Sequence, residues 1–289
     1  MSGSSVSEIL RVAVEELRGC SDSARLDAQL LLGKVLNTTR TILIARGDQN
    51  VSIAARREFG NLLARRRSGT PIAYLLGTQE FWSLSLGVTP AVLVPRPETE
   101  KLVELALERI PSDREFSILD LGTGSGAIAL AIASERPRTR LTAVDVSAAA
   151  LEIALANAQR LGLTTINWRL GSWFDAVPGE RFDLIVANPP YVAGHDSALE
   201  RLAAEPAIAL TPGFTGMEAI ETIVAGAPAH LKPSGRLIFE HGATQSGLVS
   251  ELLGRSGFTE ICSHLDFAGL PRVTLGTVQH NIRNAHDSL

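Results

Sequence analysis

From residue 117 onward, short apolar runs alternate with longer amphipathic stretches, and this alternation limits the possible folds more than any other feature of the chain. The short runs have strand length, and most stretches between them repeat their apolar residues at helical spacing. Such an alternation predicts an α/β fold, in which a mostly parallel sheet has helices on both faces. The expected strands are 117–121, 141–145, 166–170, 183–187, 236–240, 260–266 and 272–279, and the expected helices lie near 126–135, 148–161, 217–231 and 245–256.

The chain before this region has two other patterns. Ser5 and Glu8 have capping-box spacing, and helical periodicity recurs at 26–36, 40–45 and 53–67, which predicts a helical bundle. Two β-like runs, 80–86 and 88–94, then flank Gly87 and predict a β-hairpin with its turn at that glycine. We therefore expect a bundle at 1–75, a hairpin linker at 76–96 and the α/β domain at 97–289.

Composition excludes several classes of protein. With 289 residues, 45% hydrophobic and 20% charged, the chain suits two ordinary soluble domains. A net charge of -4 gives no general attraction to nucleic acid or to an anionic membrane. Cys20 and Cys262 lie far apart without metal-ligand spacing, so we expect reduced thiols and no metal site. Neither a signal peptide nor a membrane-length apolar run is apparent, which predicts a cytoplasmic protein.

A glycine-rich turn follows the first strand of the α/β domain and opens a helix. Glycines allow the backbone to turn tightly and to approach a ligand without a Cβ in the way. The spacing is G-x-G-x-G, whereas dinucleotide-binding loops have G-x-G-x-x-G, and this difference favours S-adenosylmethionine. Asp120, just before the turn, is placed to hold the amino group of a methionine moiety. The expected cofactor-binding residues of this segment are Asp120, Gly122, Thr123, Gly124, Ser125 and Gly126.

Two later residues are candidates for the same site. Asp145 ends the second strand, where a carboxylate can accept hydrogen bonds from ribose hydroxyls. The alternative is that Asp145 only caps the following helix, a task that Ser147 can perform equally well. Trp173 follows the third strand and offers a flat apolar wall for an adenine ring. The alternative for Trp173 is an ordinary place in the core.

The fourth strand ends in Asn188, Pro189, Pro190 and Tyr191. Two prolines cannot continue a central strand, so the chain leaves the sheet here, at the edge where such sheets bind ligands. Residues that precede proline are held extended, which restricts Asn188 and the carbonyl group of Pro189. A plain Asn-Pro turn is the alternative, but its position in the same sheet as the glycine-rich turn favours a functional site.

This turn suits methyl transfer to a planar nitrogen. An amide or aromatic amine nitrogen is a weak nucleophile, because its lone pair is delocalised. The Asn188 side-chain oxygen and the Pro189 carbonyl oxygen can accept hydrogen bonds from both N–H groups and stabilise the positive charge that develops on the nitrogen. Tyr191 can stack on the planar group. Asn188 and Pro189 are therefore the candidate catalytic residues, and Asn188, Pro189, Pro190 and Tyr191 are the candidate substrate-binding residues.

In this order the motifs resemble class I methyltransferases of the N-P-P-Y group, and nearly the whole chain resembles the HemK/PrmC family, the release factor glutamine methyltransferases. The resemblance rests on the helical N-terminal part, Gly77 to Trp82, Val94 to Glu100, Asp120 to Gly126, Glu205-Pro206, Leu231 to Gly235, Glu240 to Gly242 with Gln245, and Asp266 to Gly269. The segment Arg96 to Glu100 is usually missing in the related enzymes that modify a large-subunit ribosomal protein.

The resemblance implies a Rossmann-like seven-stranded sheet and an N-terminal bundle that recognises the substrate. It further implies that the enzyme, expected to be a cytoplasmic monomer, uses S-adenosylmethionine to methylate the Gly-Gly-Gln glutamine of class I release factors, which act in translation termination. Cofactor contacts are implied at Gly122 to Gly126, Asp145, Trp173 and Asn188. No membrane partner and no direct nucleic-acid partner are expected.

The chain departs from the family pattern beside the expected substrate site, and two other functions are separate alternatives. Residues 211–217 stand where the family usually has Gly-Gly-x-Asp-Gly-Leu, with Thr215 in place of the Asp, and Ser172 follows Gly171 where Ser-Asp is common. An adenine methyltransferase acting on DNA or RNA shares the N-P-P-Y chemistry, although the mildly acidic chain lacks an obvious basic domain. A non-catalytic protein that holds a translation factor is the second alternative.

Overall fold

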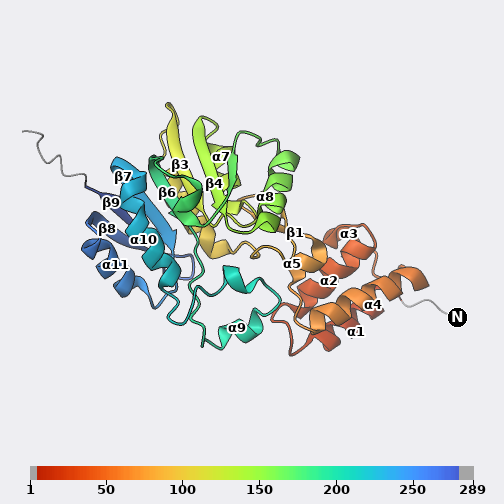
Figure 1. The fold of residues 1–289 in the computed structure, drawn as a ribbon. Coiled ribbons are helices and arrows are strands. Elements are labelled where there is room, and N and C mark those ends of the chain that lie inside the picture. The colour runs from red at the N-terminus through yellow and green to blue at the C-terminus, as the bar shows by residue number, and fades with distance from the viewer. Residues whose placement is uncertain (1–4, 280–289) are drawn as a thin grey trace, which may run out of the picture. The chain divides into compact units, whose positions relative to one another are not determined.

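The computed structural model describes residues 5–279, which fall into two compact units, Met1–Gln79 and Glu80–Leu289. The first unit is helical, and the second contains the sheet (Figure 1). Among residues 5–279, no helix combines the length and apolarity needed to cross a bilayer.

Within the described residues, the first unit is built from five helices that enclose one apolar core, and three of these helices begin at a capping hydroxyl. The Ser5 side chain accepts a hydrogen bond from the Glu8 amide at 3.3 Å, as the capping-box spacing predicts. Thr39 and Ser52 cap two further helices in the same way. The helices are α1 (Val6–Leu17), α2 (Ala24–Val35), α3 (Arg40–Ala45), α4 (Ile53–Arg67) and α5 (Ile72–Leu76). Their core includes Leu17, Leu31, Leu32, Leu43, Phe59 and Leu63.

The hairpin that follows differs from the predicted one. Its strands are β1 (Thr78–Phe81) and β2 (Leu84–Gly87), and Trp82 and Ser83 connect them with φ angles of 50° and 59°. Positive φ at both central residues belongs to a type I′ turn, whose twist matches paired strands. The expectation of strands at 80–86 and 88–94 is therefore wrong, because residues 88–94 form no strand.

Gly87 does not form the predicted turn, and its backbone is instead hydrogen-bonded to the Asn157 side chain. Its amide donates to Asn157 Oδ1 at 2.6 Å, and Asn157 Nδ2 donates to its carbonyl at 3.0 Å. A Cβ at this position would lie 3.0 Å from Asn157 Oδ1. Glycine therefore permits the strand to approach a side chain that lies distant in the sequence.

The second unit contains a seven-stranded sheet with the order β5-β4-β3-β6-β7-β9-β8. The first five strands in this order pair in parallel, and β9 pairs antiparallel with both β7 and β8. This arrangement confirms the predicted parallel sheet with an antiparallel hairpin at one edge. The strands are β3 (Phe116–Leu121), β4 (Thr139–Asp145), β5 (Asn167–Leu170), β6 (Phe182–Ala187), β7 (Leu231–Glu240), β8 (Phe258–Leu265) and β9 (Pro271–Val278).

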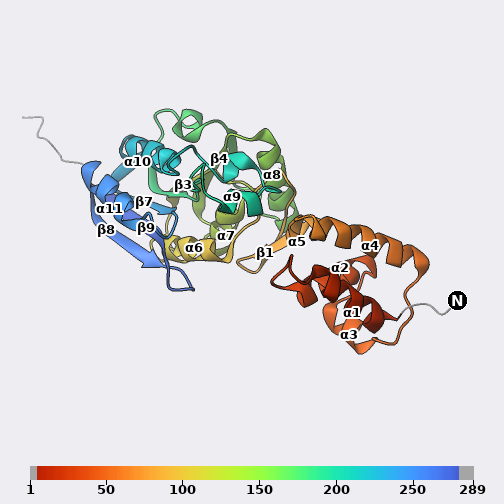
Figure 2. The same cartoon turned by 90° about the horizontal axis from the view of Figure 1, so that it is seen from below.

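Both faces of the sheet are buried at its central strands, because neighbouring residues of these strands enter different cores. Ile118 belongs to the core beneath α6 and α7, whereas Leu119 belongs to the core beneath α10 and α11. Figure 2 shows α6 and α7 on one side of the sheet and α10 on the other. The helices of this unit are η1 (Pro97–Thr99), α6 (Glu100–Leu107), α7 (Ala127–Glu135), α8 (Ala148–Leu161), η2 (Trp173–Ala176), α9 (Ala198–Arg201), η3 (Ala207–Ala209), α10 (Glu218–His230) and α11 (Ser246–Arg255).

Candidate active site

A cavity of about 420 Å³ opens at the carboxyl ends of β3, β4 and β6. Strand order reverses between β3 and β6, and such a reversal leaves a crevice where α/β sheets bind ligands. The structure brings most of the predicted site residues to the cavity wall: Gly122, Thr123, Gly124, Ser125, Asp145, Trp173, Asn188 and Pro190. Four other predicted residues are not part of the wall: Asp120, Gly126, Pro189 and Tyr191.

The turn after β3 depends on its three glycines. Gly122, Gly124 and Gly126 have φ angles of 72°, 56° and 82°, in the left-handed region that side chains with a Cβ rarely adopt. A Cβ at Gly124 would meet no atom within 4 Å, so this glycine borders open space. A ligand can therefore approach the backbone of the turn closely.

Gly126→Ala is expected to destabilise the fold by about 3 kcal/mol, because a left-handed conformation and overpacking add their costs. The new Cβ would lie 3.0 Å from Leu130 Cδ1 and 3.2 Å from Trp168 Cη2. Gly162→Ala is the matched control, since Gly162 has φ 70° and no atom within 4 Å of the added Cβ. Urea unfolding measures both variants, and equal losses of stability would show that packing at Gly126 contributes nothing.

Asp145 links the ends of two neighbouring strands. Its Oδ2 accepts from the Gly124 amide at 2.8 Å, and its Oδ1 accepts from the Ser147 amide at 2.9 Å. Helix α8 is capped by Ser147, whose hydroxyl accepts from the Ala150 amide at 3.2 Å. Burial raises the Asp145 pKa, against the lowering by these amide bonds. Asp145 thus orients the glycine turn and remains partly exposed at the cavity wall.

Asp120 lies beneath the turn and is fully buried. The Thr123 hydroxyl donates to its Oδ2 at 2.6 Å, whereas Oδ1 has no hydrogen bond of normal geometry among the described residues. Burial raises the Asp120 pKa to about 7, with Asp145 adding to the rise and Thr123 opposing it. A buried carboxylate oxygen without a donor is costly, and a ligand ammonium group, directly or through water, would remove that cost. The Asp120 carboxyl group therefore suits a ligand that carries an ammonium group, such as the methionine moiety of S-adenosylmethionine.

Trp173 is at once part of the core and part of the cavity wall. Its φ is 45°, and an added Cβ at Gly122 would lie 3.5 Å from its ring. The ring also packs against the core cluster that includes residues of α10. Trp173 therefore belongs to the core and lines the cavity at the same time, and its contact with an adenine ring stays a prediction.

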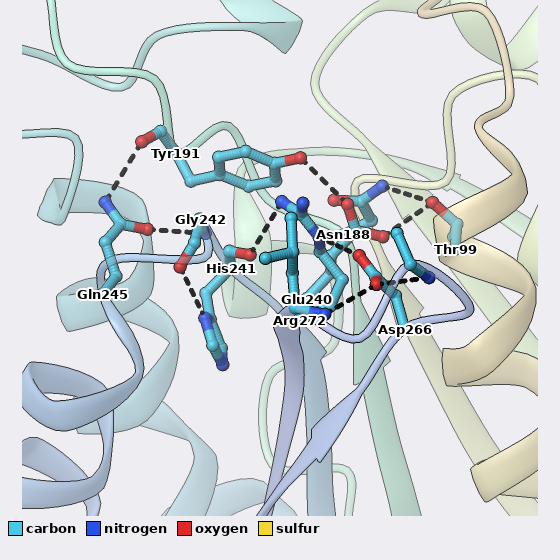
Figure 3. A network of polar contacts seen from close by, with 11 residues as sticks. Thr99, Asn188, Tyr191, Glu240, His241, Gly242, Gln245, Asp266 and Arg272 are labelled. Carbon is cyan, nitrogen blue, oxygen red and sulfur yellow. Dashed lines mark hydrogen bonds and ion pairs between the residues drawn. The ribbon is translucent and has the colours of Figure 1, made fainter.

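Asn188 follows β6 at the cavity wall, and Thr99 anchors one end of its side chain. Asn188 Nδ2 donates to Thr99 Oγ1 at 3.1 Å, and Thr99 Oγ1 donates to Glu240 Oε2 at 2.6 Å (Figure 3). Within residues 5–279, neither Asn188 Oδ1 nor the Pro189 carbonyl accepts a hydrogen bond. The two oxygen acceptors that the sequence nominates therefore have free lone pairs.

The Tyr191 hydroxyl is bonded away from the cavity. It donates to Glu240 Oε1 at 3.0 Å, while Gln245 Nε2 donates to the Tyr191 carbonyl at 3.1 Å (Figure 3). Burial, and then the charge of Glu240, raise the Tyr191 pKa. The ring packs against the core cluster near α10. Stacking of Tyr191 on a substrate stays a prediction.

Sequence reasoning gave no chemical function to several polar residues of this site. Thr99 and Glu240 form the support behind Asn188, and Glu205 accepts from the Val94 amide at 3.0 Å while pairing with the Arg96 guanidinium. These residues lie in segments that carry the family resemblance. One usable signal is that Glu240 ends a buried strand at the same edge as Asn188, where a carboxylate needs partners.

Comparison with known proteins agrees with this geometry. The Methyltransferase small domain model matches residues 98–216, and the PrmC N-terminal domain model matches residues 8–77. A release factor glutamine methyltransferase of Xylella fastidiosa is 47% identical over 254 residues, 87% of this chain and 92% of the relative. The Pseudomonas aeruginosa relative of the same name is 46% identical over 258 residues, 89% of this chain and 93% of the relative.

The chain belongs to the release factor glutamine methyltransferase family. Solved structures agree on the fold alone. A Pyrococcus furiosus methyltransferase has a TM-score of 0.54 at 18% identity and covers 76% of this chain and all of its own. A 16S rRNA N2 G1207 methyltransferase of Thermus thermophilus has a TM-score of 0.53 at 20% identity, over 70% of this chain and 50% of its own. The sheet is thus that of a class I methyltransferase.

Proposed function

We propose that this protein transfers a methyl group from S-adenosylmethionine to the side-chain amide nitrogen of the glutamine in the Gly-Gly-Gln motif of class I release factors. The observation that carries this proposal is the 46–47% identity to release factor glutamine methyltransferases over most of both chains. The free Oδ1 of Asn188 at the cavity wall supports it chemically.

The cavity residues suit the cofactor. When bound, S-adenosylmethionine supplies an electrophilic methyl carbon attached to a positively charged sulfur. The backbone of Gly122 to Gly126 lets the ligand lie close to the sheet, and Asp145 offers the remaining lone pairs of a half-buried carboxylate to ribose hydroxyls. Asp120 supplies negative charge for an ammonium group, and Trp173 supplies a flat wall for a ring. Asp120 lies buried beneath the glycine turn, whereas the turn, Asp145 and Trp173 line the cavity, and this arrangement supports a single elongated ligand.

On the substrate side, Asn188 Oδ1 and the Pro189 carbonyl accept the two N–H groups of the glutamine amide. These bonds hold the nitrogen facing the methyl group, and they strengthen as positive charge develops on that nitrogen. The methylated nitrogen then loses one proton to water or to a nearby carbonyl, so no dedicated base is required. The helical N-terminal unit, which matches the PrmC N-terminal domain model, recognises the release factor in this proposal.

A labelled-methyl assay tests the substrate. Purified release factor is incubated with the protein and methyl-labelled cofactor, next to a release factor whose Gly-Gly-Gln glutamine is replaced. We expect label in the natural release factor only. Equal labelling of both proteins would refute the assigned position, and label in nucleic acid that survives protease would favour an adenine methyltransferase instead.

A further inference from the structure

A chain of hydrogen bonds lies behind Asn188 and joins residues from three separate parts of the sequence. Glu240 Oε2 accepts from Thr99 Oγ1 at 2.6 Å, and Thr99 Oγ1 accepts from Asn188 Nδ2 at 3.1 Å. The other oxygen, Glu240 Oε1, accepts from the Tyr191 hydroxyl at 3.0 Å. Figure 3 shows Glu240 between Tyr191 and Thr99, with Asn188 beside Thr99. Glu240 and Thr99 are buried, with 1% and 4% of their surfaces exposed.

The chemistry of these groups gives the chain a direction. An ionised carboxylate only accepts hydrogen bonds, and a hydroxyl has one proton to donate. Because Thr99 donates its proton to Glu240, it can offer only a lone pair to Asn188. The Asn188 atom that faces Thr99 must therefore be the donor Nδ2, which leaves Oδ1 for the cavity.

Each oxygen of Glu240 accepts a hydrogen bond from a hydroxyl group. Burial raises the pKa of Glu240, and Glu98 adds to the rise, whereas the bonds from Thr99 and Tyr191 and the nearby Arg272 guanidinium lower it. Arg272 is itself held by Asp266 Oδ2 at 3.2 Å. Both oxygens of Glu240 therefore act as hydrogen-bond acceptors, one for Thr99 and the other for Tyr191.

The direction matters because the two ends of an asparagine amide have nearly the same shape and opposite polarity. A half-turn of the amide would present its NH2 group to the cavity, where it would face the N–H groups of a substrate amide, donor against donor. We propose that Thr99 and Glu240 are positioning residues that fix the polarity of Asn188 so that its oxygen faces the substrate nitrogen. This inference rests on the proposed function, since the substrate must present N–H groups.

Thr99→Val and Thr99→Ser form a matched pair that tests the proposal. Valine keeps the branched shape but leaves Asn188 Nδ2 without its acceptor, whereas serine keeps the hydroxyl. We expect kcat/KM for release factor methylation to fall about 30-fold in Thr99→Val and to remain within about threefold in Thr99→Ser, the size of one buried hydrogen bond. Affinity for S-adenosylhomocysteine, measured by calorimetry, should stay within about threefold in both variants. Equal kcat/KM values for the two variants would overturn the proposal.

Glu240→Gln provides an independent test. The glutamine NH2 group can donate to Thr99, so the direction of the chain can reverse and kcat/KM should fall. If both residues act through the same chain, the Thr99→Val, Glu240→Gln double variant loses no more activity than Thr99→Val alone. Additive losses would contradict a shared chain.

One measurement separates this inference from the proposed function, because it needs no substrate. The side-chain NH2 protons of Asn188, assigned by their loss in Asn188→Ala, are followed by NMR. We expect slow exchange with water in the wild type and in Thr99→Ser, and fast exchange in Thr99→Val. If release factor is not methylated but this pattern appears, the substrate assignment fails and the anchored amide stands. If release factor is methylated but the Asn188 NH2 protons exchange at the same rate in the wild type and both Thr99 variants, Thr99 does not anchor Asn188 and the proposed function stands.

Discussion

Asn188→Ala is expected to reduce kcat for release factor methylation by about 100- to 1000-fold, the range found when one preorganised hydrogen-bonding group is removed from a charge-stabilising site. The alanine removes the oxygen that would accept a substrate N–H group and stabilise its developing charge. It also leaves Thr99 without a donor, but the buried pair of Thr99 and Glu240 persists. Single-turnover methylation of purified release factor measures the loss in the chemical step.

Two controls show whether the loss of kcat arises from the missing Asn188 side chain and not from weakened cofactor binding or a general effect of substitution. Binding of S-adenosylhomocysteine, for which Asn188 is one of several predicted contacts, should weaken by far less than kcat falls, because the glycine turn and Asp145 remain intact. Asn167→Ala, an exposed position on the edge strand β5, should keep the wild-type rate. If Asn188→Ala kept more than half of the wild-type kcat, Asn188 would have no catalytic function and the assigned mechanism would be wrong.

Asp120→Asn is expected to stabilise the free protein at pH 8 and to weaken cofactor binding at the same pH. The Asp120 pKa is about 7 in the folded protein, against an ordinary value of 3.8. Below about pH 4 the carboxyl is protonated in both folded and unfolded states, so it contributes no difference. As pH rises toward 7, the unfolded chain releases its proton first, and the stability of the fold falls. Above pH 7 the full cost, roughly 4 kcal/mol, is present.

Asparagine removes this charge but buries an NH2 group, so we expect a net gain of about 1 to 2 kcal/mol at pH 8 and little gain at pH 4. Urea unfolding at both values measures it. Asp113→Asn, an exposed carboxylate, is the control and should show no such dependence on pH. Affinity for S-adenosylhomocysteine should fall about tenfold at pH 8, because an ammonium group loses its counter-charge. Unchanged affinity would remove Asp120 from the cofactor site.

A stabilised but weaker-binding Asp120→Asn variant would have a simple physical meaning. A carboxylate that is costly in the free protein becomes favourable once a positive ligand group neutralises it, so stability is exchanged for affinity. The unpartnered Oδ1 beneath the glycine turn is the structural sign of that exchange.

Local patterns in the sequence determined the layered fold and most of the cavity wall. Alternating apolar strands and amphipathic helices can bury their surfaces only as a sheet with two covered faces, and Ile118 and Leu119 indeed enter different cores. The glycines at 122, 124 and 126 signal positive φ because glycine alone adopts it without strain. Proline after Asn188 marks the end of β6 for a similarly local reason.

Only the tertiary structure decided which distant polar groups meet. Thr99 and Glu240 are 141 positions apart, and nothing in either segment identifies the other as its partner. Gly87 is bound by Asn157, so its absence of a Cβ serves a contact 70 positions away and not the turn that its composition suggested. Periodicity reports the burial of a residue within its own element, whereas a hydrogen bond between elements depends on how those elements pack. The direction of the Asn188 amide is of this second kind, because it is set by a carboxylate that Asn188 does not touch.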